Sequence, residues 1–559
     1  MPASGKSRVG KTCAQNHPDY FPGGFRDLDA QIEARTQKSI AEVFETEGEK
    51  AFRELELDQL RAELKSFGGI LALGGGTLTS TDGVIELENY RQNGGLVVYL
   101  DVDMDLALDR IKRKNTRPLL RDNAAQKWSQ LHDDRYKTFE NASDLRLRIS
   151  QQPADDFTEE EKHRQASVTA QQIVHALDVR RVRVLRDGAV KYNVNIGSNL
   201  VQEIPGALTA DTHKVFLIHT DSVLEHAQRV LRAIQSAGYE CVLHSVPDAE
   251  DAKTIAVYTE CLEKMAELKM TRQDAVIGVG GGAVTDLAGF IAATYLRGIK
   301  CINVPTSLLA QVDASTGGKT GINLNAGKNL CGAFYEPKAV YVDLETLSTL
   351  PKRELIEGLA EAIKIGFTFD ETVLHAIHRL VPESPQSLHQ NQGARTHQHE
   401  ECQFEIAVDN ETYADIIFRS VSVKARVVSA DLYDSGLREF LNYGHTFGHA
   451  IEKLEHYTWR HGEAVSVGMV FAAHLGHKLG MIPSNLLQEH IEALQRVGLP
   501  VFWKTNATFD DVLSVMRVDK KAQGSDLRFV LLEGKLQPRI VKNPPLSVLQ
   551  QCFEEVTHP

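Results

Sequence analysis

Three histidines near residue 445 could bind a metal ion. His445 and His449 are four residues apart, so on a helix their imidazoles would share one face. Zn²⁺ accepts imidazole and carboxylate ligands in sites that keep open positions for substrate oxygens. Spacing alone favours the His445/His449 pair. The other candidates in the same stretch are His461, Glu452, Glu455 and Glu463.

A run of three glycines could bind the phosphates of a nucleotide. Gly280, Gly281 and Gly282 follow an apolar segment typical of a strand, and they precede a helical segment that contains Asp286. Without side chains, such a turn lets a pyrophosphate approach backbone N–H groups at the start of the helix. The run is not G-x-G-x-x-G, so on its own it fits an ordinary tight turn equally well.

A second phosphate-binding pattern stands at the start of the chain. Gly5-Lys6-Ser7 matches the end of G-x-x-x-x-G-K-[ST], in which the lysine reaches the outer phosphates and the hydroxyl holds Mg²⁺. The first glycine of the pattern and its preceding strand are not in this sequence. Either the start lies upstream or this domain is weakened.

Composition limits the kinds of protein that could carry these residues. A chain of 559 residues is too long for one core, so two to four domains are expected. No apolar run reaches the ~18–20 residues of a membrane span, and the N-terminus is not a signal peptide. Seven scattered cysteines without a CxxC pair predict a reducing, cytoplasmic setting. The net charge of −13 argues against nucleic-acid binding.

The order of predicted elements indicates three domains and an α/β fold class. Residues 1–177 alternate helices with short apolar strands, which predicts a P-loop-like domain with a parallel sheet that lacks its first strand. Residues 178–345 again alternate strands and helices and predict a Rossmann-like α/β domain. Strand signals fade after Pro351, so 346–559 are predicted to form a helical metal-binding domain. Within it, 382–403 is rich in Gln, His, Pro and Ser and is interpreted as a flexible insertion.

Further residues follow the first phosphate pattern in a fixed order. They are Asp27 and Asp29 (FRDLD), Arg53 (AFRELE), Gly75 (LGGGT), Arg117 (RPLL) and Arg135 (DDRYK). Together with Gly5-Lys6-Ser7, this order and spacing resemble the shikimate kinase family over nearly all of 1–177.

That resemblance implies phosphorylation of shikimate with ATP and Mg²⁺. Arg53 and Arg135 would hold the shikimate carboxylate by bidentate hydrogen bonds, and Asp29 would accept hydrogen bonds from the ring hydroxyls. The implied shikimate-binding residues are Asp29, Arg53, Gly75 and Arg135. The implied ATP and Mg²⁺ residues are Gly5, Lys6, Ser7 and the lid residue Arg117, with Asp27 near the metal shell.

Longer motifs occupy the chain from about residue 185 onward. They include PDAEDAKT, VGGGAVTDLAG, VPTSLLAQVDASTGGKTGINLNAGKN, GLAEAIKIG, LREFLNYGHTFGHA and RHGEAV. They closely resemble the 3-dehydroquinate synthase family, interrupted mainly by 382–403. The resemblance implies Glu361, His445 and His461 as ligands of Zn²⁺ or Co²⁺, and leaves His449 for the substrate. Glu361 lies 84 residues before His445, where no local pattern would find it.

The same resemblance implies the substrate, the cofactor and the assembly. The substrate would be 3-deoxy-D-arabino-heptulosonate 7-phosphate, whose phosphate and carboxylate suit a cationic pocket, and the assembly would be a homodimer. The implied substrate and catalytic residues are Asp313, Lys319, Lys364, Lys424, Arg438, Asn442, His449, Asn329 and Arg297, the last serving the neighbouring subunit. The implied NAD residues are Glu250, Lys253, Gly281, Gly282, Asp286, Thr306, Ser307, Lys319, Lys328 and Thr349.

Two other interpretations remain open at this stage. The C-terminal part could be another NAD- and metal-dependent sugar-phosphate cyclase or a polyol dehydrogenase. A dehydrogenase would accumulate NADH, whereas the synthase releases phosphate without net NADH, because hydride passes to NAD⁺ and returns. The N-terminal part could be a non-catalytic scaffold that retains only the kinase fold.

Overall fold

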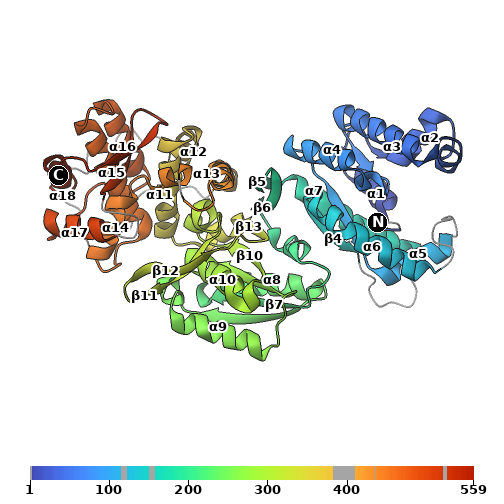
Figure 1. Cartoon of the computed structure of the whole chain (residues 1–559), viewed down its shortest axis with the longest axis horizontal. Helices are drawn as coiled ribbons and strands as arrows, with labels where there is room; N and C mark the ends of the chain where they lie inside the picture. Colours follow the sequence, from blue (N-terminus) through green and yellow to red (C-terminus); the bar gives the residue numbers. More distant parts are fainter. Residues whose placement is uncertain are drawn as a thin grey trace. The chain divides into compact units, whose positions relative to one another are not determined.

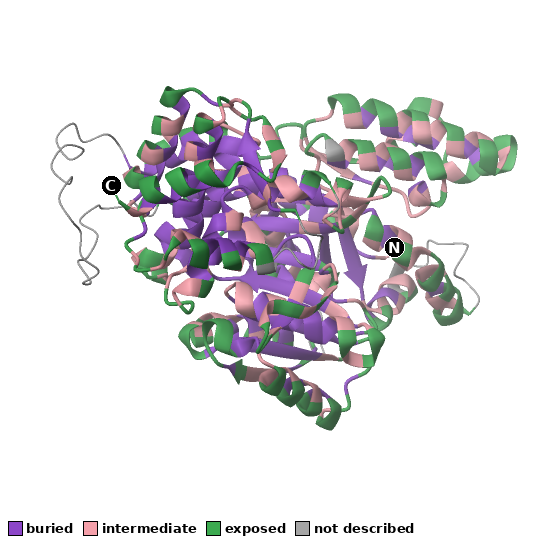
Figure 2. Cartoon of the chain, turned by 60° about the vertical axis from the view of Figure 1, so that its left-hand side comes forward, coloured by how far each residue is buried: buried purple, intermediate pink, exposed green. Residues whose placement is uncertain are grey.

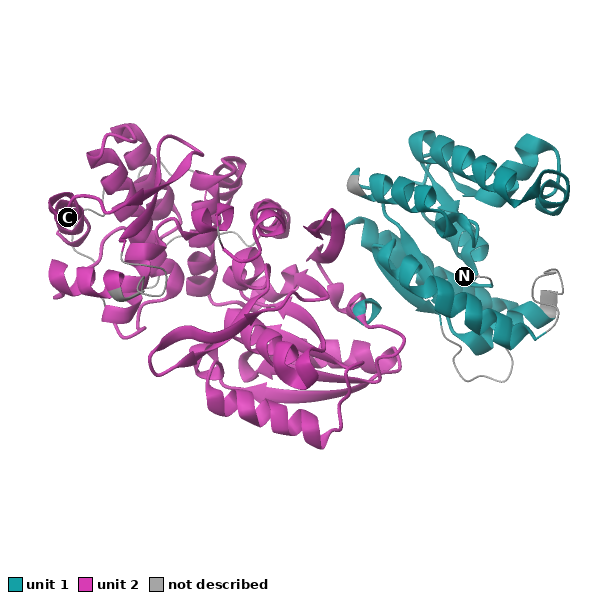
Figure 3. Cartoon of the chain, viewed as in Figure 1, with its two compact units in different colours: residues 1–179, 205–207 teal, residues 180–204, 208–559 magenta. Residues whose placement is uncertain are grey.

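A computed structural model describes residues 3–114, 123–149, 158–381, 409–434, 436–519 and 526–558. Its internal contacts divide the chain into two compact units, shown in Figure 3. Unit 1 comprises 1–179 with 205–207, and unit 2 comprises 180–204 with 208–559. The predicted lid residue Arg117 and the predicted insertion 382–403 lie outside the described residues. The predicted boundary at 345 falls inside unit 2 and stays a prediction.

Unit 1 combines seven helices with two pairs of parallel strands in its described part. The strand pairs are β1 (Phe25–Asp27) with β2 (Ile70–Ala72) and β3 (Val98–Val102) with β4 (Leu145–Ile149). The helices are α1 (Lys6–Asn16), α2 (Leu28–Thr36), α3 (Ile40–Ser66), α4 (Thr81–Gln92), α5 (Met104–Lys114), α6 (Ala124–Asn141) and α7 (Glu159–Leu177).

Polar side chains fix where several helices of unit 1 begin. Ser39 and Glu42 form a capping box at the start of α3, and the carboxylate of Asp27 accepts from the N–H of Asp29 at the start of α2. These caps satisfy N–H groups that have no partner within a helix. One core cluster of unit 1 packs around the buried Trp128 of α6 and the strand pair β3–β4.

Unit 2 contains a seven-stranded sheet in the order β5-β6-β13-β10-β9-β7-β8. All neighbours are parallel except β5 and β6, which form an antiparallel hairpin closed by Asp187-Gly188, both with positive φ. The strands are β5 (Arg180–Arg186), β6 (Ala189–Gly197), β7 (Lys214–Thr220), β8 (Glu240–Val246), β9 (Ala275–Gly280), β10 (Lys300–Pro305) and β13 (Ala339–Asp343).

Helices connect the strands of this sheet, and a separate hairpin projects from it. The helices are α8 (Leu224–Ser236), α9 (Ile255–Glu267) and α10 (Gly282–Thr294). The hairpin pairs β11 (Lys319–Leu324) with β12 (Gly327–Phe334). Gly278 lets α10 pack directly on β9, because a Cβ at this position would lie 2.8 Å from the Cβ of Ala288.

The remainder of unit 2 is mainly helical, and Figure 1 shows it in yellow, orange and red. Its helices are α11 (Lys352–Thr368), α12 (Thr372–Leu380), α13 (Asn410–Ala430), α14 (His445–Leu454), α15 (His461–Lys478), α16 (Ser484–Arg496), α17 (Phe509–Asp519) and α18 (Leu546–Thr557). In Figure 2 the buried residues of unit 2 fill the sheet and the central helices.

One antiparallel strand pair within this helical part was not predicted. It joins β14 (Arg528–Leu532) to β15 (Pro538–Lys542). The short apolar run RFVLL packs in the large core of unit 2, where a buried strand has no alternating pattern to distinguish it from a helix. The predicted α/β fold class with its helical C-terminal part is otherwise confirmed. In the described residues, no helix is long and apolar enough to cross a membrane.

Helices α14 and α15 cross so closely that glycine is required at the contact. A Cβ on Gly468 would lie 2.0 Å from the carbonyl oxygen of Gly444. On the same helix, a Cβ on Gly476 would meet its nearest atom at 3.6 Å, an ordinary contact. The crossing therefore depends on Gly468 and not on Gly476.

We expect Gly468→Ala to destabilise unit 2 by about 1–3 kcal/mol, because the helices must separate to admit the methyl group. Gly476→Ala is the matched control, and it should be neutral or stabilising by up to about 1 kcal/mol through helix propensity. Thermal melting of both variants measures the difference. Equal melting temperatures would contradict the close crossing.

Candidate functional site

Three side chains from three helices of unit 2 converge on one point. Glu361 lies in α11, while His445 and His461 are the first residues of α14 and α15. The Nε2 atoms of both histidines lie 3.4 Å from Oε1 of Glu361. The ligand atoms of this triad all lie within 4.8 Å of one another, which is the spacing expected around a shared metal ion.

Both imidazoles are turned by hydrogen bonds on their other nitrogen. Nδ1 of His445 lies 3.2 Å from the carbonyl oxygen of Tyr443, and Nδ1 of His461 lies 3.3 Å from Oε2 of Glu452. Each of these oxygens can accept a hydrogen bond from Nδ1, and in a neutral ring this would leave Nε2 with a lone pair directed toward Glu361. Neutral imidazoles of this tautomer are the form that binds a metal.

The carboxylate of Glu361 fits a bound cation. Only 2% of Glu361 is exposed, and its Oε1 accepts no hydrogen bond from the described residues. Its other oxygen accepts from Nζ of Lys364. A buried carboxylate oxygen without a donor is costly, and a divalent ion between Oε1 and the two Nε2 atoms would remove that cost. One carboxylate and two imidazoles suit Zn²⁺ or Co²⁺.

The two histidines differ in how they titrate. Burial, with the nearby ammonium of Lys364, lowers the pKa of His445 to about 3 and keeps its ring neutral. Burial also acts to lower the pKa of His461, but the neighbouring carboxylates of Glu361 and Glu452 raise it to about 10. A metal at Nε2 of His461 would therefore bind in competition with a proton.

A second group of predicted residues forms a cationic cluster in the same unit. Nζ of Lys424 lies 2.7 Å from Oδ1 of Asp313, and the Arg438 guanidinium donates to the carbonyl of Gly317 at 3.1 Å. Gly317 has a φ of +103°, and a Cβ there would lie 2.8 Å from Arg438. The glycine thus leaves room for both cations beside one loop.

Burial leaves these cations poorly hydrated. Burial lowers the pKa of Lys424 to about 8, an effect that the neighbouring Asp313 only partly offsets. Burial also lowers the pKa of Arg438. Two buried cations with one half-buried carboxylate between them favour an anionic ligand.

The predicted nucleotide residues gather at the carboxyl ends of β9 and β10. Gly281 caps α10 without any side-chain hydrogen bond, and Ser307 Oγ would lie 3.4 Å from a Cβ on it. The N–H of Thr306 donates to the carbonyl of Gly280 at 3.0 Å. This arrangement leaves the start of α10 accessible to a phosphate group.

Lysines connect this glycine turn to the β11–β12 hairpin. Nζ of the buried Lys253 lies 2.6 Å from Oδ2 of Asp286 and also donates to the side chain of Asn329. Nζ of Lys328 lies 4.0 Å from Glu250 and 3.2 Å from Oε1 of Glu452. The hairpin is therefore held both to the nucleotide residues and to helix α14 at the metal triad.

The remaining predicted site residues of unit 2 differ in their exposure and in their contacts. Arg297 is exposed with a φ of +67°, Lys319 pairs with Asp434 at 2.6 Å, and Thr349 donates to the carbonyl of Thr346. Asn442 is half-buried in the turn before α14. His449 is exposed, with its ring 5.3 Å from that of His445.

The structure distinguishes among the residues near His445 that the sequence left as candidate metal ligands. Glu452 and His449 form a second possible triad with His461. Glu455 instead accepts from the indole N–H of Trp503 at 2.8 Å, and Glu463 pairs with Arg353 at 2.7 Å. Neither Glu455 nor Glu463 belongs to either triad.

In unit 1, Asp27 organises the phosphate pattern at the start of α1. Ser7 Oγ donates to Oδ2 of Asp27 at 3.0 Å, and Nζ of Lys6 lies 3.9 Å from the same oxygen. Gly5 precedes α1 with a φ of +90°, a conformation that favours glycine. The hydroxyl, the ammonium and the carboxylate thus lie together at a helix N-terminus.

The predicted shikimate residues surround the glycine loop 74–76. The Arg135 guanidinium donates to the carbonyl of Gly75 at 2.6 Å, and a Cβ on Gly76 would lie 2.5 Å from the Arg53 guanidinium. Burial and the nearby charge of Arg53 lower the pKa of Arg135. Burial raises the pKa of Asp29, against the charge of Lys6. Two guanidiniums and a carboxylate thus line one loop.

The sequence interpretation missed two carboxylates that hold these groups. The buried carboxylate of Glu56 accepts hydrogen bonds from the Arg53 guanidinium at 2.6 Å and from the Thr77 hydroxyl at 2.6 Å. Its position three residues after Arg53 on one helix was the available signal. Asp434 pairs with Lys319 across 115 residues, and no local pattern could have found it.

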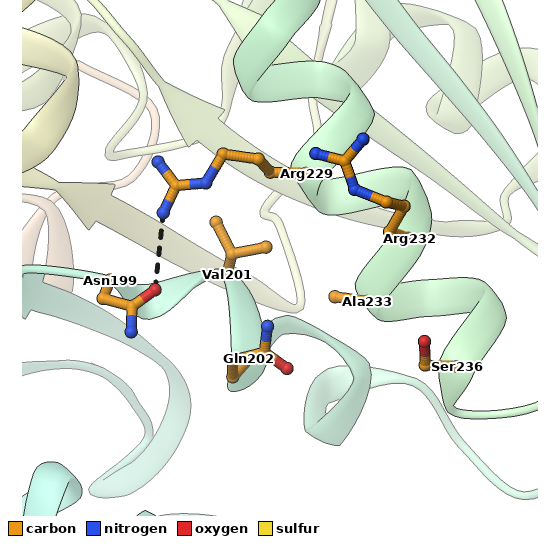
Figure 4. Close-up of a pocket in the computed structure, with 7 residues that line it drawn as sticks. All are labelled: Asn199, Val201, Gln202, Arg229, Arg232, Ala233 and Ser236. Atoms are coloured by element: carbon orange, nitrogen blue, oxygen red, sulfur yellow. Dashed lines mark hydrogen bonds between the residues drawn. The ribbon is translucent and has the colours of Figure 1, made fainter.

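The cavity in Figure 4 is separate from these sites. It has a volume of about 150 Å³ beside α8 and is lined by Asn199, Val201, Gln202, Arg229, Arg232, Ala233 and Ser236. Arg229 hydrogen-bonds Asn199 at 3.4 Å and pairs with Glu345 at 2.7 Å. None of the predicted site residues lines it.

Comparison with known proteins identifies both parts of the chain. Residues 243–357 and 358–522 match the family models of the N-terminal and C-terminal parts of 3-dehydroquinate synthase. A 3-dehydroquinate synthase of Pseudarthrobacter chlorophenolicus is 44% identical over 370 residues, which is 66% of this chain and 95% of that protein. The chain belongs to the 3-dehydroquinate synthase family. Residues 2–176 match the shikimate kinase model, which confirms the predicted fusion of two enzymes.

Two solved structures share the fold of unit 2. A 2-deoxy-scyllo-inosose synthase, complexed with carbaglucose-6-phosphate, NAD⁺ and Co²⁺, has a TM-score of 0.56 and 23% identity over 68% of this chain and 100% of its own. The 2-epi-5-epi-valiolone synthase from Streptomyces hygroscopicus subsp. jinggangensis, with NAD⁺ and Zn²⁺ bound, has a TM-score of 0.57 and 21% identity over 67% of this chain and 99% of its own. At these identities the likeness supports the fold alone.

Proposed function

We propose that unit 2 converts 3-deoxy-D-arabino-heptulosonate 7-phosphate to 3-dehydroquinate and phosphate, with NAD⁺ and Zn²⁺ or Co²⁺. The observation that carries the proposal is the triad of Glu361, His445 and His461, in the same unit as the buried cations Lys424 and Arg438. A site with both a metal position and an anion pocket suits a substrate that carries hydroxyls, a phosphate and a carboxylate. Membership of the synthase family supports the same reaction.

Each group of residues has its own task in this proposal. When bound, the metal polarises a substrate hydroxyl, and NAD⁺ accepts and returns a hydride. Lys424 and Arg438 hold anionic groups of the substrate and fix its orientation. Lys253, Asp286 and the turn at Gly281 hold the dinucleotide. Asp313 and His449 exchange protons with the substrate.

Removal of phosphate is assigned mainly to the substrate itself. After oxidation, the new ketone acidifies the adjacent C–H, and the substrate phosphate takes that proton as it leaves. Return of the hydride would then allow the ring to open, and an intramolecular aldol step would close the carbocycle. Lys364 and Asn442 position the substrate, and the pocket stabilises the charges that develop.

We assign unit 1 the ATP-dependent phosphorylation of shikimate. Lys6 and Ser7, tied to Asp27, would hold the phosphates and Mg²⁺ of ATP. Arg53 and Arg135 would hold the shikimate carboxylate beside Gly75, with Asp29 on the ring hydroxyls. The gathering of these residues around the loop 74–76 supports the assignment.

The last part of the proposal concerns the cellular compartment. The cysteines of the described residues are free thiols, and most are buried, which agrees with a reducing cytoplasm. The homodimer, with Arg297 serving the neighbouring subunit, stays a prediction from the family resemblance.

Replacing a metal ligand should remove both metal and turnover. We expect His461→Ala and Glu361→Gln to lower phosphate release by more than about 100-fold, which exceeds the loss caused by an outer partner of a metal ligand. The control His477→Ala lies on the same helix, bonds the carbonyl of Ile482 and should keep activity. Steady growth of NADH without phosphate release would instead indicate a dehydrogenase.

Substrate binding should weaken at alkaline pH. Since burial lowers the pKa of Lys424 to about 8, its ammonium is charged below that pH and is lost as pH rises through it. We expect the Kd of the sugar phosphate to rise up to tenfold per pH unit above 8. Lys424→Arg keeps its charge, because arginine does not titrate in this range, and should flatten that limb. Identical pH profiles for the two proteins would contradict the role of Lys424.

Kinase activity should depend on the arginine pair. Arg135→Lys replaces a planar donor pair with one ammonium, and we expect the KM for shikimate to rise about 10- to 100-fold, equivalent to one charge-assisted hydrogen bond. Arg164→Lys on α7, where Arg164 pairs with Glu161 on the surface, is the control. Shikimate-dependent ADP formation is the measurement. If the protein forms no ADP with shikimate, unit 1 is a scaffold.

A further inference from the structure

We propose that Glu452 is a positioning residue that orients the metal ligand His461 and is shared with Lys328 of the cofactor site. The proposal rests on the metal triad of the proposed function, and it assigns a role to a residue outside that triad. Glu452 lies in α14, is 5% exposed, and has each of its two carboxylate oxygens bonded to a different donor.

The first donor is the imidazole of His461. Its Nδ1 lies 3.3 Å from Oε2 of Glu452, while its Nε2 lies 3.4 Å from Oε1 of Glu361. With Nδ1 donating to Glu452, the ring is held in the tautomer whose Nε2 lone pair faces the other two ligands. A carboxylate in this place also makes the imidazole a stronger donor of electrons to a metal.

The second donor is the ammonium of Lys328. Its Nζ lies 3.2 Å from Oε1 of Glu452, 4.0 Å from Glu250 and 4.2 Å from the centre of the Tyr457 ring. Lys328 belongs to strand β12, so Glu452 joins the hairpin that carries cofactor residues to the helix that carries a metal ligand. One carboxylate therefore fixes groups from both halves of unit 2.

His449, Glu452 and His461 could also be taken for a second metal site, since their ligand atoms lie within 4.8 Å of one another. Two observations argue against it. The ammonium of Lys328 already occupies one oxygen of Glu452 and would repel a cation. In addition, His461 would need to bind metals through both nitrogens at once. The geometry points to an orienting carboxylate.

The sharing of Glu452 makes a specific prediction about the variant Glu452→Gln. The introduced amide has one oxygen and one N–H₂ group, so it accepts from only one of the two donors and confronts the other with its own hydrogens. Lys328, as a charged donor, should take the oxygen. The ring of His461 then loses its acceptor and its fixed tautomer.

We expect Glu452→Gln to weaken the binding of Zn²⁺ and Co²⁺ by about 10- to 100-fold, measured by competition with a chromogenic chelator. The absorption spectrum of the Co²⁺ form should shift, because the geometry of one ligand changes. Adding Lys328→Met frees the amide oxygen for His461, so the double variant should bind metal more tightly than Glu452→Gln alone. Glu452→Asp keeps the charge on a shorter side chain, so its metal affinity should lie between those of the wild type and Glu452→Gln.

Glu455→Gln is the matched control on the same stretch of chain, because Glu455 bonds Trp503 and should leave metal affinity unchanged. Wild-type affinity and spectrum in Glu452→Gln and Glu452→Asp would overturn this inference and leave the proposed function intact. Two metal equivalents in the wild type, one of them lost in Glu452→Gln, would make the cluster a second metal site and would also overturn it. If the wild type binds no metal, or binds metal that Glu361→Gln does not remove, the proposed function fails and the inference fails with it.

Discussion

The buried charge of Glu361 is the constraint on which the site of unit 2 depends. A carboxylate this deep is stable only if opposite charge or donors surround it. Lys364, one helical turn further along α11, supplies one partner, and the Nε2 atoms of two imidazoles lie 3.4 Å from the remaining oxygen. A cation bound among these three side chains would stabilise the buried carboxylate, which supports the proposed metal site.

Close helix packing places the ligands around that charge. His445 and His461 are each the first residue of a helix, and α14 and α15 touch backbone to backbone at Gly444 and Gly468. Side chains at this crossing would push the helices apart and separate the two imidazoles. The proposed metal site therefore depends on residues outside the ligand triad, and the same packing brings Glu452 within reach of His461.

The sequence was most informative where function depends on local order, and least where it depends on distant contacts. Alternating apolar segments predicted the strands from β7 to β10, and the Gly280–Gly282 run predicted the turn before α10. Local spacing singled out His445 and His449, whereas the geometry joins His445 to Glu361 from another helix. Only the family resemblance could suggest Glu361, because a glutamate on a helix has no local signal of its depth. The roles of Glu452 and Glu56 likewise needed the fold, since each connects elements separated along the chain.

In both units, side chains of like charge lie close together, and a ligand of opposite charge would stabilise them. In unit 1, Arg53 and Arg135 approach one glycine loop closely enough for the first to lower the pKa of the second. In unit 2, Lys424 and Arg438 lie beside one loop with Asp313 and Asp434 near them, while Glu361 Oε1 accepts no hydrogen bond from the described residues. Keeping such charges buried costs folding energy, which packing elsewhere offsets. The sign of the charge at each site agrees with the ligand proposed for it, because a carboxylate would stabilise the arginine pair, a phosphate would stabilise Lys424 and Arg438, and a metal ion would stabilise Glu361.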